Sequence, residues 1–213
     1  MIAKTISKQT LQRMPLYLSY LKSLPKDDTV HISATVMAND LKLNDVQVRK
    51  DLAQVSDGGR PKIGYIIEDL MKDIEHCLGY DNVDTAILIG AGNLGRALLA
   101  YDGFSEYGMD IVTAFDVDET IIGTTMCGKQ VLPMDKLPSV CKRMKIKIGI
   151  ITVDSQEAQN VCDVLVNNEV LAIWNFAPVH LNVPDHVLVQ NENMVNSLAI
   201  LSNHMAERLS IQV

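Results

Sequence analysis

A glycine-rich turn constrains the fold of this chain more than any other feature of its sequence. The apolar run TAILIG ends at Gly90, and residues 90–95 read GAGNLG before the helical pattern RALLAY begins. A GxGxxG turn between a strand and a helix is typical of dinucleotide-binding folds. Its first glycine permits a tight turn, its second lets the backbone approach a pyrophosphate, and its third lets helix and strand pack closely. The N–H groups and positive dipole end of that helix would face the phosphates. The alternative is that the glycines serve packing alone.

The sequence around and after this turn alternates between apolar runs and helical patterns. We predict strands at residues 85–90, 110–116, 146–153, 171–176 and 186–190, and helices at 93–101, within 131–144, at 155–168 from an N-cap at Ser155, and at 191–209. Apolar strands without alternation, separated by helices, favour a parallel sheet covered on both faces. Asp116 ends the second strand, where a carboxylate about 20 residues beyond the glycines hydrogen-bonds a ribose 2′-OH, so NAD(H) is favoured over NADP(H).

The beginning of the chain has the opposite charge from the rest. Residues 1–65 hold ten Lys/Arg and six Asp/Glu, a net charge of +4, whereas residues 66–213 carry −11, which gives −7 for the chain. A basic module joined to an acidic body indicates that only the first part meets a polyanion.

This basic part has the spacing of a helix-turn-helix. We predict a helix that begins at Pro15, then a helix at residues 34–41 capped by Ser33 and a helix at residues 46–55 capped by Asp45. Val36 and Val46 are expected to pack inward. Two short helices joined by a tight turn, the second carrying adjacent cations, are typical of DNA-binding proteins.

A candidate wing follows these helices. Residues 56–62 read SDGGRPK and are followed by the extended run IGYII, and a connector helix is expected at residues 68–78. This segment is consistent with a β-hairpin wing beside a helix-turn-helix, or with an ordinary surface hairpin bearing solvated charges.

Composition excludes several other classes of protein. The 213 residues are 47% hydrophobic and 21% charged, which excludes disorder and collagen. A membrane span needs about 18 consecutive apolar residues, and no stretch of the chain approaches that length. The N-terminal sequence also lacks the apolar core of a signal peptide, so we expect a cytoplasmic protein. The four cysteines form no CxxC pair, which predicts reduced thiols and no metal site.

Three functions remain compatible with these patterns. The first is a DNA-binding protein that responds to NAD(H). The second is an NAD-dependent oxidoreductase with a helical N-terminal arm, for which His180 is the best-placed histidine, although the sequence holds no Tyr-x-x-x-Lys pair. The third is a cofactor-binding scaffold whose helical module binds protein. Neighbouring Arg49 and Lys50 favour DNA, and we predict no catalytic residue.

In the order of its motifs, the chain resembles the Rex family of redox-sensing transcriptional repressors. The motifs are QVRKDL, GAGNLGRALLAY, AFDVD, NFAP and VPDHVLVQN, and together they span nearly the whole chain. The resemblance implies a winged helix-turn-helix domain followed by a Rossmann-like NAD(H)-binding domain and a domain-swapped C-terminal helix, expected at residues 1–80, 81–190 and 191–213. It implies a homodimer that binds palindromic double-stranded operator DNA when NADH is scarce and leaves it when NADH binds. Neither a membrane nor a metal is implied.

The resemblance also assigns candidate site residues. The cofactors NADH and NAD⁺ would meet Gly90, Ala91, Gly92, Asn93, Leu94, Gly95, Tyr101, Asp116, Val117, Thr152, Val153, Asn175, Phe176, Ala177 and Pro178. Operator DNA would meet Ser33, Gln47, Arg49, Lys50, Arg60, Lys62 and Tyr65. The segment NFAP would lie on the nicotinamide side, and Tyr101 would help to distinguish the two redox states.

Three departures from the family's pattern stand out. The wing reads VSDGGRPKIGY where the family's usual pattern is FGxxGxRGxGY. Ser19 stands where many members have arginine, and Asn193 where its aspartate partner often stands. We therefore expect redox discrimination in this chain to depend on contacts other than that interdomain pair.

Overall fold

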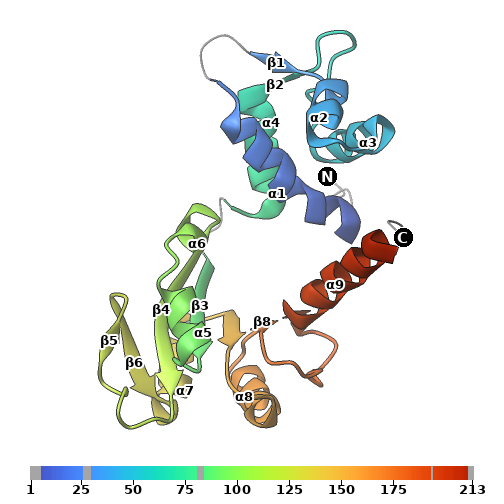
Figure 1. Cartoon of the computed structure of the whole chain (residues 1–213). Helices are drawn as coiled ribbons and strands as arrows, with labels where there is room; N and C mark the ends of the chain where they lie inside the picture. The colour runs from blue at the N-terminus through green and yellow to red at the C-terminus, as the bar shows by residue number, and fades with distance from the viewer. Residues whose placement is uncertain (1–5, 26–29, 81–83, 193, 211–213) are drawn as a thin grey trace. The chain divides into compact units, whose positions relative to one another are not determined.

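The computed structural model describes residues 6–25, 30–80, 84–192 and 194–210. The chain divides into two compact units, residues 1–82 and 83–213 (Figure 1). Each unit has its own hydrophobic core. The predicted α/β architecture is confirmed, whereas the expected boundaries after residues 80 and 190 stay predictions.

The first unit is helical with a small two-stranded sheet. Its elements are α1 (Lys8–Ser23), β1 (His31–Ile32), α2 (Ala34–Leu41), α3 (Asp45–Val55), β2 (Tyr65–Ile66) and α4 (Ile67–Leu78). Strand β2 pairs antiparallel with β1, and Arg60 bridges Gly64 in the turn that precedes β2. The wing is therefore built on β1, which the sequence pattern did not predict.

The helix ends of this unit correct two expectations. Ser33 caps α2 as predicted, since its hydroxyl accepts a hydrogen bond from the Val36 N–H. The cap of α3 is Asn44, whose side chain accepts from the Gln47 N–H, so Asp45 is the first helical residue instead. Helix α1 begins at Lys8 with Ser7 as its cap, and Pro15 lies inside it rather than at its start.

The inward face of α2 and α3 also differs from expectation. Met37, Val48 and Leu52 are fully buried, but Val36 and Val46 are 47% and 54% exposed. Val36 precedes buried Met37, and Val46 lies two residues before buried Val48, so apolar spacing alone did not reveal which side α1 and α4 cover. Their exposure leaves an open surface on both helices.

The second unit is a mostly parallel sheet with helices on both faces. Its strands run in the order β5-β6-β4-β3-β7-β8-β9, and every pairing except β5 with β6 is parallel. The strands are β3 (Asp84–Ile89), β4 (Met109–Asp116), β5 (Thr125–Met126), β6 (Lys129–Pro133), β7 (Ile148–Ile151), β8 (Ala172–Asn175) and β9 (Leu188–Asn191). From β6 to β9 this is the doubly wound order of dinucleotide-binding folds.

Alternate residues of the central strands pack on opposite faces of this sheet. Ile87 and Ile89 of β3 join a core with α7 (Leu137–Met144) and α8 (Ser155–Asn167). Ala86 and Leu88 join a second core with α5 (Asn93–Leu99). The remaining helices of the unit are α6 (Gly103–Glu106), the 3-10 turn η1 (Met134–Lys136) and α9 (Met194–Ser210).

Three local expectations for this unit were wrong or incomplete. The first residues of the segment expected to be a turn and a helix from residue 131 belong to strand β6, because they pair with β4. Helix α8 is preceded by Asp154 in extended conformation, so Ser155 is its first residue rather than its cap. The pattern did not predict α6 or β5.

Among the described residues, no helix is long and apolar enough to cross a membrane, and no cluster of His, Cys, Asp and Glu could hold a metal ion.

Candidate functional site

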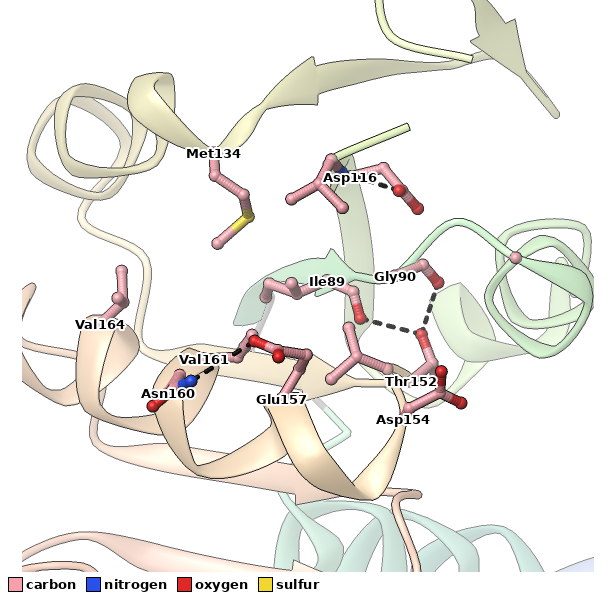
Figure 2. Close-up of a pocket in the computed structure, with 13 residues that line it drawn as sticks. Ile89, Gly90, Asp116, Met134, Thr152, Asp154, Glu157, Asn160, Val161 and Val164 are labelled. Carbon is pink, nitrogen blue, oxygen red and sulfur yellow. Dashed lines mark hydrogen bonds between the residues drawn. The ribbon is translucent and has the colours of Figure 1, made fainter. Parts of the chain in front are cut away.

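A cavity of about 490 Å³ opens at the carboxyl ends of β3, β4 and β7 (Figure 2). Strands β4 and β7 are the two neighbours of β3, so the chain leaves β3 toward one edge of the sheet for β4 and later returns to the opposite side of β3 for β7. Ligands of doubly wound folds bind at such a switch point. The lining residues are Ile89, Gly90, Gly92, Asp116, Val117, Met134, Thr152, Val153, Asp154, Glu157, Asn160, Val161 and Val164.

The three glycines of the turn have different roles in the geometry. Gly90 has a φ of 100°, and a β-carbon there would lie 2.9 Å from the Thr152 carbonyl carbon. A β-carbon on Gly95 would lie 2.0 Å from the Gly90 carbonyl oxygen, so this position keeps α5 close to the turn. At Gly92 a β-carbon would have no neighbour within 4 Å. Gly92 therefore borders open space, as the approach of a pyrophosphate requires.

Asp116 is tied to the glycine turn through its carboxylate. Its Oδ2 accepts a hydrogen bond from the Ala91 N–H at 2.6 Å, and its Oδ1 accepts from the Val117 and Asp118 N–H groups at 2.7 Å and 3.0 Å. A carboxylate has about four acceptor sites, so one remains for a ribose hydroxyl. The glycine turn and the Asp116 carboxylate are thus held in one fixed relation.

Thr152 and Val153 support the turn from β7. The Thr152 hydroxyl lies 2.7 Å from the Gly90 carbonyl oxygen and 3.0 Å from that of Ile89, as Figure 2 shows. A Val153 methyl carbon would lie 2.9 Å from a β-carbon on Gly90. The Thr152 hydrogen bonds hold the turn at a positive φ that glycine adopts readily, and Gly92 faces the cavity.

Helix α8 supplies a wall that motif reasoning missed. Four of its residues line the cavity at i, i+3, i+4 and i+7, which are Glu157, Asn160, Val161 and Val164. Figure 2 shows Met134, Val161 and Val164 gathered at one side of the cavity, away from Gly90. The apolar periodicity of residues 155–168 marks the buried face of α8, which carries Ala158, Cys162 and Leu165, so it predicts the helix but not this wall. The apolar side has the character of a slot for a nucleotide base.

The other predicted cofactor residues do not line this cavity. Tyr101, Phe104, Trp174 and Phe176 form a chain of ring contacts with centroid separations of 4.9, 5.6 and 4.8 Å, and all except Tyr101 pack against the core on the α5 side. The structure thus links Tyr101 with Phe176 of the NFAP segment. Tyr101 itself is 55% exposed.

Asn175 is fully buried and uses its side chain within the protein. Its Oδ1 accepts from the Ala177 N–H at 3.0 Å, and its Nδ2 donates toward the Ala177, Val179 and Asn191 oxygens at 2.9–3.1 Å. Ala177 is buried and Pro178 is exposed. The polar atoms of Asn175 shape the NFAP turn and connect it to the end of β9.

The candidate nucleic-acid residues lie on α2, α3 and the wing. Gln47, Arg49 and Lys50 are exposed on α3. The Arg49 Nη2 bonds the Asp45 carboxylate at 2.9 Å and 3.1 Å and lies 3.4 Å from the Thr35 hydroxyl. Lys50 has no ion-pair partner among the described residues. Arg49 is thus held in place, whereas Lys50 is available to a phosphate.

The remaining candidates divide between exposed and packed positions. Arg60 and Lys62 are exposed in the wing, where Lys62 has a φ of 66°. Tyr65 is only 8% exposed, and a β-carbon on Gly59 would lie 2.7 Å from its ring. Burial raises the pKa of Tyr65. The Ser33 hydroxyl is used as the α2 cap, so Ser33 and Tyr65 support the wing and α2 from within.

A buried carboxylate that motif reasoning missed connects α3 to α1. Asp51 is fully buried and accepts hydrogen bonds from Thr10, Arg13, Tyr17 and Gln47. Burial alone would raise the pKa of Asp51, but these hydrogen bonds, with Arg13 first, hold it below its usual range. Desolvation and the bond to Asp51 raise the pKa of Tyr17 to about 12. The α1 partners lie 34–41 positions before Asp51 in the sequence, so no short sequence pattern indicated this network.

The expectation for the interdomain pair of Ser19 and Asn193 stays a prediction. Ser19 is exposed on α1. Asn193 lies outside the described residues.

Family models match both parts of the chain. Residues 5–53 match the model described as a putative DNA-binding protein N-terminus, and residues 81–179 match that of a CoA binding domain.

Full-length relatives share one description. The chain is 39% identical over 210 residues to the redox-sensing transcriptional repressor Rex of Pelotomaculum thermopropionicum, with 99% of each chain covered. It is 40% identical over 198 residues to the redox-sensing transcriptional repressor Rex of Treponema denticola, covering 93% of this chain and 94% of that one.

Solved structures of one protein, RSP, match along the whole chain. RSP in complex with beta-NAD⁺ and operator DNA matches with a TM-score of 0.91 and 32% identity, over 98% of this chain and 96% of that one. RSP in complex with beta-NADH matches with a TM-score of 0.87 and 31% identity, over 97% of both chains.

Proposed function

This chain belongs to the Rex family of redox-sensing transcriptional repressors, and from that premise we propose how its parts carry out the switch. The protein is a homodimeric repressor that binds operator DNA, is released from it by NADH, and so senses the ratio of NADH to NAD⁺. The rival reading as an oxidoreductase falls, because members of the family are repressors and not enzymes.

One observation carries the proposal for this chain's own residues. The same chain holds a helix-turn-helix with exposed cations on α3 and a cavity at a switch point bordered by Gly92 and Asp116. The first can bind a polyanion and the second a dinucleotide.

At the cofactor site, the backbone at Gly92 would receive the pyrophosphate, and Asp116 would accept from the ribose hydroxyl. The apolar side around Met134, Val161 and Val164 would hold the adenine. Asp154 and Glu157 add negative charge to the cavity, so an extra phosphate on the ribose is disfavoured. When bound, the cofactor supplies a nicotinamide ring whose charge changes with its redox state.

At the DNA site, α3 would enter the major groove with its N-terminal half toward the bases. Lys50, Arg60 and Lys62 would contact phosphates, while Gln47 and Arg49 would face base edges. Ser33 and Tyr65 would support this surface from inside the unit.

Helix α9 would complete the dimer. The side chains of Val195, Leu198, Ile200, Leu201, Met205 and Leu209 are 58–69% exposed. An apolar surface of this kind on one helix is typical of a subunit contact. We assign residues 191–213 to dimerisation, residues 1–80 to DNA and residues 81–190 to NAD(H). A protein whose partner is operator DNA acts where the DNA is, so we propose a cytoplasmic location.

A gel-shift titration tests the proposal. The wild-type protein should bind a duplex selected from a pool of randomised palindromes, NADH should release it, and NAD⁺ or NADPH at the same concentration should release it far less. Operator binding that is indifferent to NADH would contradict the assignment of the cavity.

A further inference from the structure

The buried network around Asp51 includes one residue that faces outward. Asp51 lies on α3 and accepts hydrogen bonds from three residues of α1. The donors are Arg13 Nε at 2.6 Å and Nη2 at 2.8 Å, the Tyr17 hydroxyl at 2.9 Å and the Thr10 hydroxyl at 3.1 Å. The fourth donor is Gln47 Nε2 at 2.9 Å, from one turn earlier on α3 itself. Gln47 is exposed, so this residue joins the buried network to the surface of α3.

The chemistry of Asp51 determines which way the Gln47 amide points. An ionised carboxylate only accepts hydrogen bonds, so the amide NH₂ of Gln47 must face it and the amide oxygen must face away. Arg13, Tyr17 and Thr10 favour the ionised form because each donates to it. The usual freedom of a surface glutamine to flip its amide is therefore removed.

Gln47 lies in the first turn of α3, which is the part of a recognition helix that meets base edges. With one N–H committed to Asp51, its amide keeps one N–H and the carbonyl oxygen. That pair matches the N7 acceptor and N6 donor of adenine in the major groove, the edge to which glutamine binds with two hydrogen bonds.

We propose that Asp51 is a positioning residue for sequence reading, which acts by fixing the Gln47 amide so that α3 selects adenine at one position of each operator half-site. The proposal rests on the proposed function and names a specificity determinant within it. Asp51 touches no base, and its effect reaches DNA only through Gln47.

The experiment uses the full-length protein and a duplex selected by the wild type from a randomised palindromic pool. Each base pair of one half-site, with its symmetry mate, is then replaced in turn, and the affinities give a preference at each position. Wild type should prefer adenine at one position by about 5- to 140-fold, the range that corresponds to a bidentate base contact. Gln47→Ala should reduce that preference to within about twofold without changing the other positions.

Asp51→Asn is the decisive variant. It keeps the shape of the side chain but can donate as well as accept, so the Gln47 amide is free to flip. We expect the adenine preference to fall as it does in Gln47→Ala, and the double variant to lose no more than either single one. Tyr17→Phe is the matched control, because it removes a donor on the opposite carboxylate oxygen and leaves the Gln47 contact to Oδ1 in place. Its base preference should stay that of the wild type.

A second substitution covers the case in which Asp51→Asn does not fold. Gln47→Glu keeps Asp51 and its α1 donors, but Asp51 repels the new carboxylate, which turns toward the groove as an acceptor-only group, so adenine preference should be lost in favour of cytosine, whose N4 donates. An unchanged adenine preference in Asp51→Asn or in Gln47→Glu, or an equal loss in Tyr17→Phe, would overturn the inference. A wild type that binds no duplex at all would refute the proposed function instead, and with it this inference.

Discussion

Gly92 and Gly95 belong to one motif, yet their geometry predicts opposite effects of the same change. Gly92 caps α5 with φ −67° and ψ −161°, which any residue adopts, and a β-carbon there would meet nothing within 4 Å. At Gly95 a β-carbon would lie 2.0 Å from the Gly90 carbonyl oxygen and 3.0 Å from a Leu88 methyl carbon. A side chain at Gly92 therefore enters only the cavity, whereas one at Gly95 must push α5 away from the turn.

The expected magnitudes follow from this difference. Alanine at Gly92 should change the free energy of unfolding by no more than about 0.5 kcal/mol, since exposed substitutions without new contacts stay within that range. Valine at Gly92 should weaken NADH binding by more than about 100-fold, equal to ~2.8 kcal/mol, because its methyl groups occupy the space of the pyrophosphate. Alanine at Gly95 should cost ~2–3 kcal/mol of stability through overpacking. In a chain of this length that cost lowers the melting temperature by about 4–12 °C.

Calorimetric titration of NADH and thermal unfolding, both on the purified variants, measure the two effects separately. Gly92→Val should unfold near the wild-type temperature while its NADH signal disappears, and it should stay on operator DNA when NADH is added. Unchanged NADH affinity in Gly92→Val would remove the glycine turn from the cofactor site. A Gly95→Ala protein as stable as wild type would refute the packing argument.

Three further outcomes are expected. Lys50→Ala should make the negative slope of log K for operator binding against log salt shallower by about 0.9, because one phosphate contact is lost, and should leave NADH affinity unchanged. Gel shifts over a series of salt concentrations measure this slope. The pKa of Asp51 is lower in the folded protein than in the unfolded chain, so ionised Asp51 stabilises the fold above the unfolded pKa, and this stability is lost as the pH falls through the folded pKa. The melting temperature should therefore drop below about pH 4, and it should drop less steeply in Asp51→Asn. A chain ending at Glu192 should sediment as a monomer and lose its NADH response, and an intact NADH-responsive dimer would place the subunit contact outside α9.

Local sequence patterns were sufficient to predict the strand, glycine turn and carboxylate at the cavity of the second unit. A strand, a glycine turn and a carboxylate at the end of the next strand occupy positions set by chain geometry, and Asp116 and Gly92 indeed border one cavity. The wall of α8 was not predicted, although Asn160 and Val164 share a helical face with Glu157. Its residue types carry no dinucleotide signature, and only the order of the strands brings that face to the site.

The contacts that the sequence did not predict share a different cause. Val36 and Val46 are apolar and lie close in sequence to buried positions, and which side of a short helix is covered depends on α1 and α4, far away in sequence. The Asp51 network joins residues up to 41 positions apart, so its partners look like ordinary polar positions of α1. Likewise Tyr101 and Phe176 come together only through the rings of Phe104 and Trp174.

The separation into two cores places a requirement on the switch. In the proposed function NADH binds in the second unit and the operator meets the first, so the ligand acts on DNA binding only if it favours an arrangement of the dimer that the operator does not accept. A ligand of equal affinity for both arrangements shifts nothing, and moving the population from 1:99 to 99:1 needs about 10⁴-fold tighter binding, or ~5.5 kcal/mol. By reciprocity, saturating operator must weaken NADH binding by the same factor that NADH weakens operator binding. The single hydride that separates NADH from NAD⁺ can supply only part of that difference directly. The rest must come from the contacts that its binding rearranges, and the exposed apolar stripe of α9 offers a surface for such contacts.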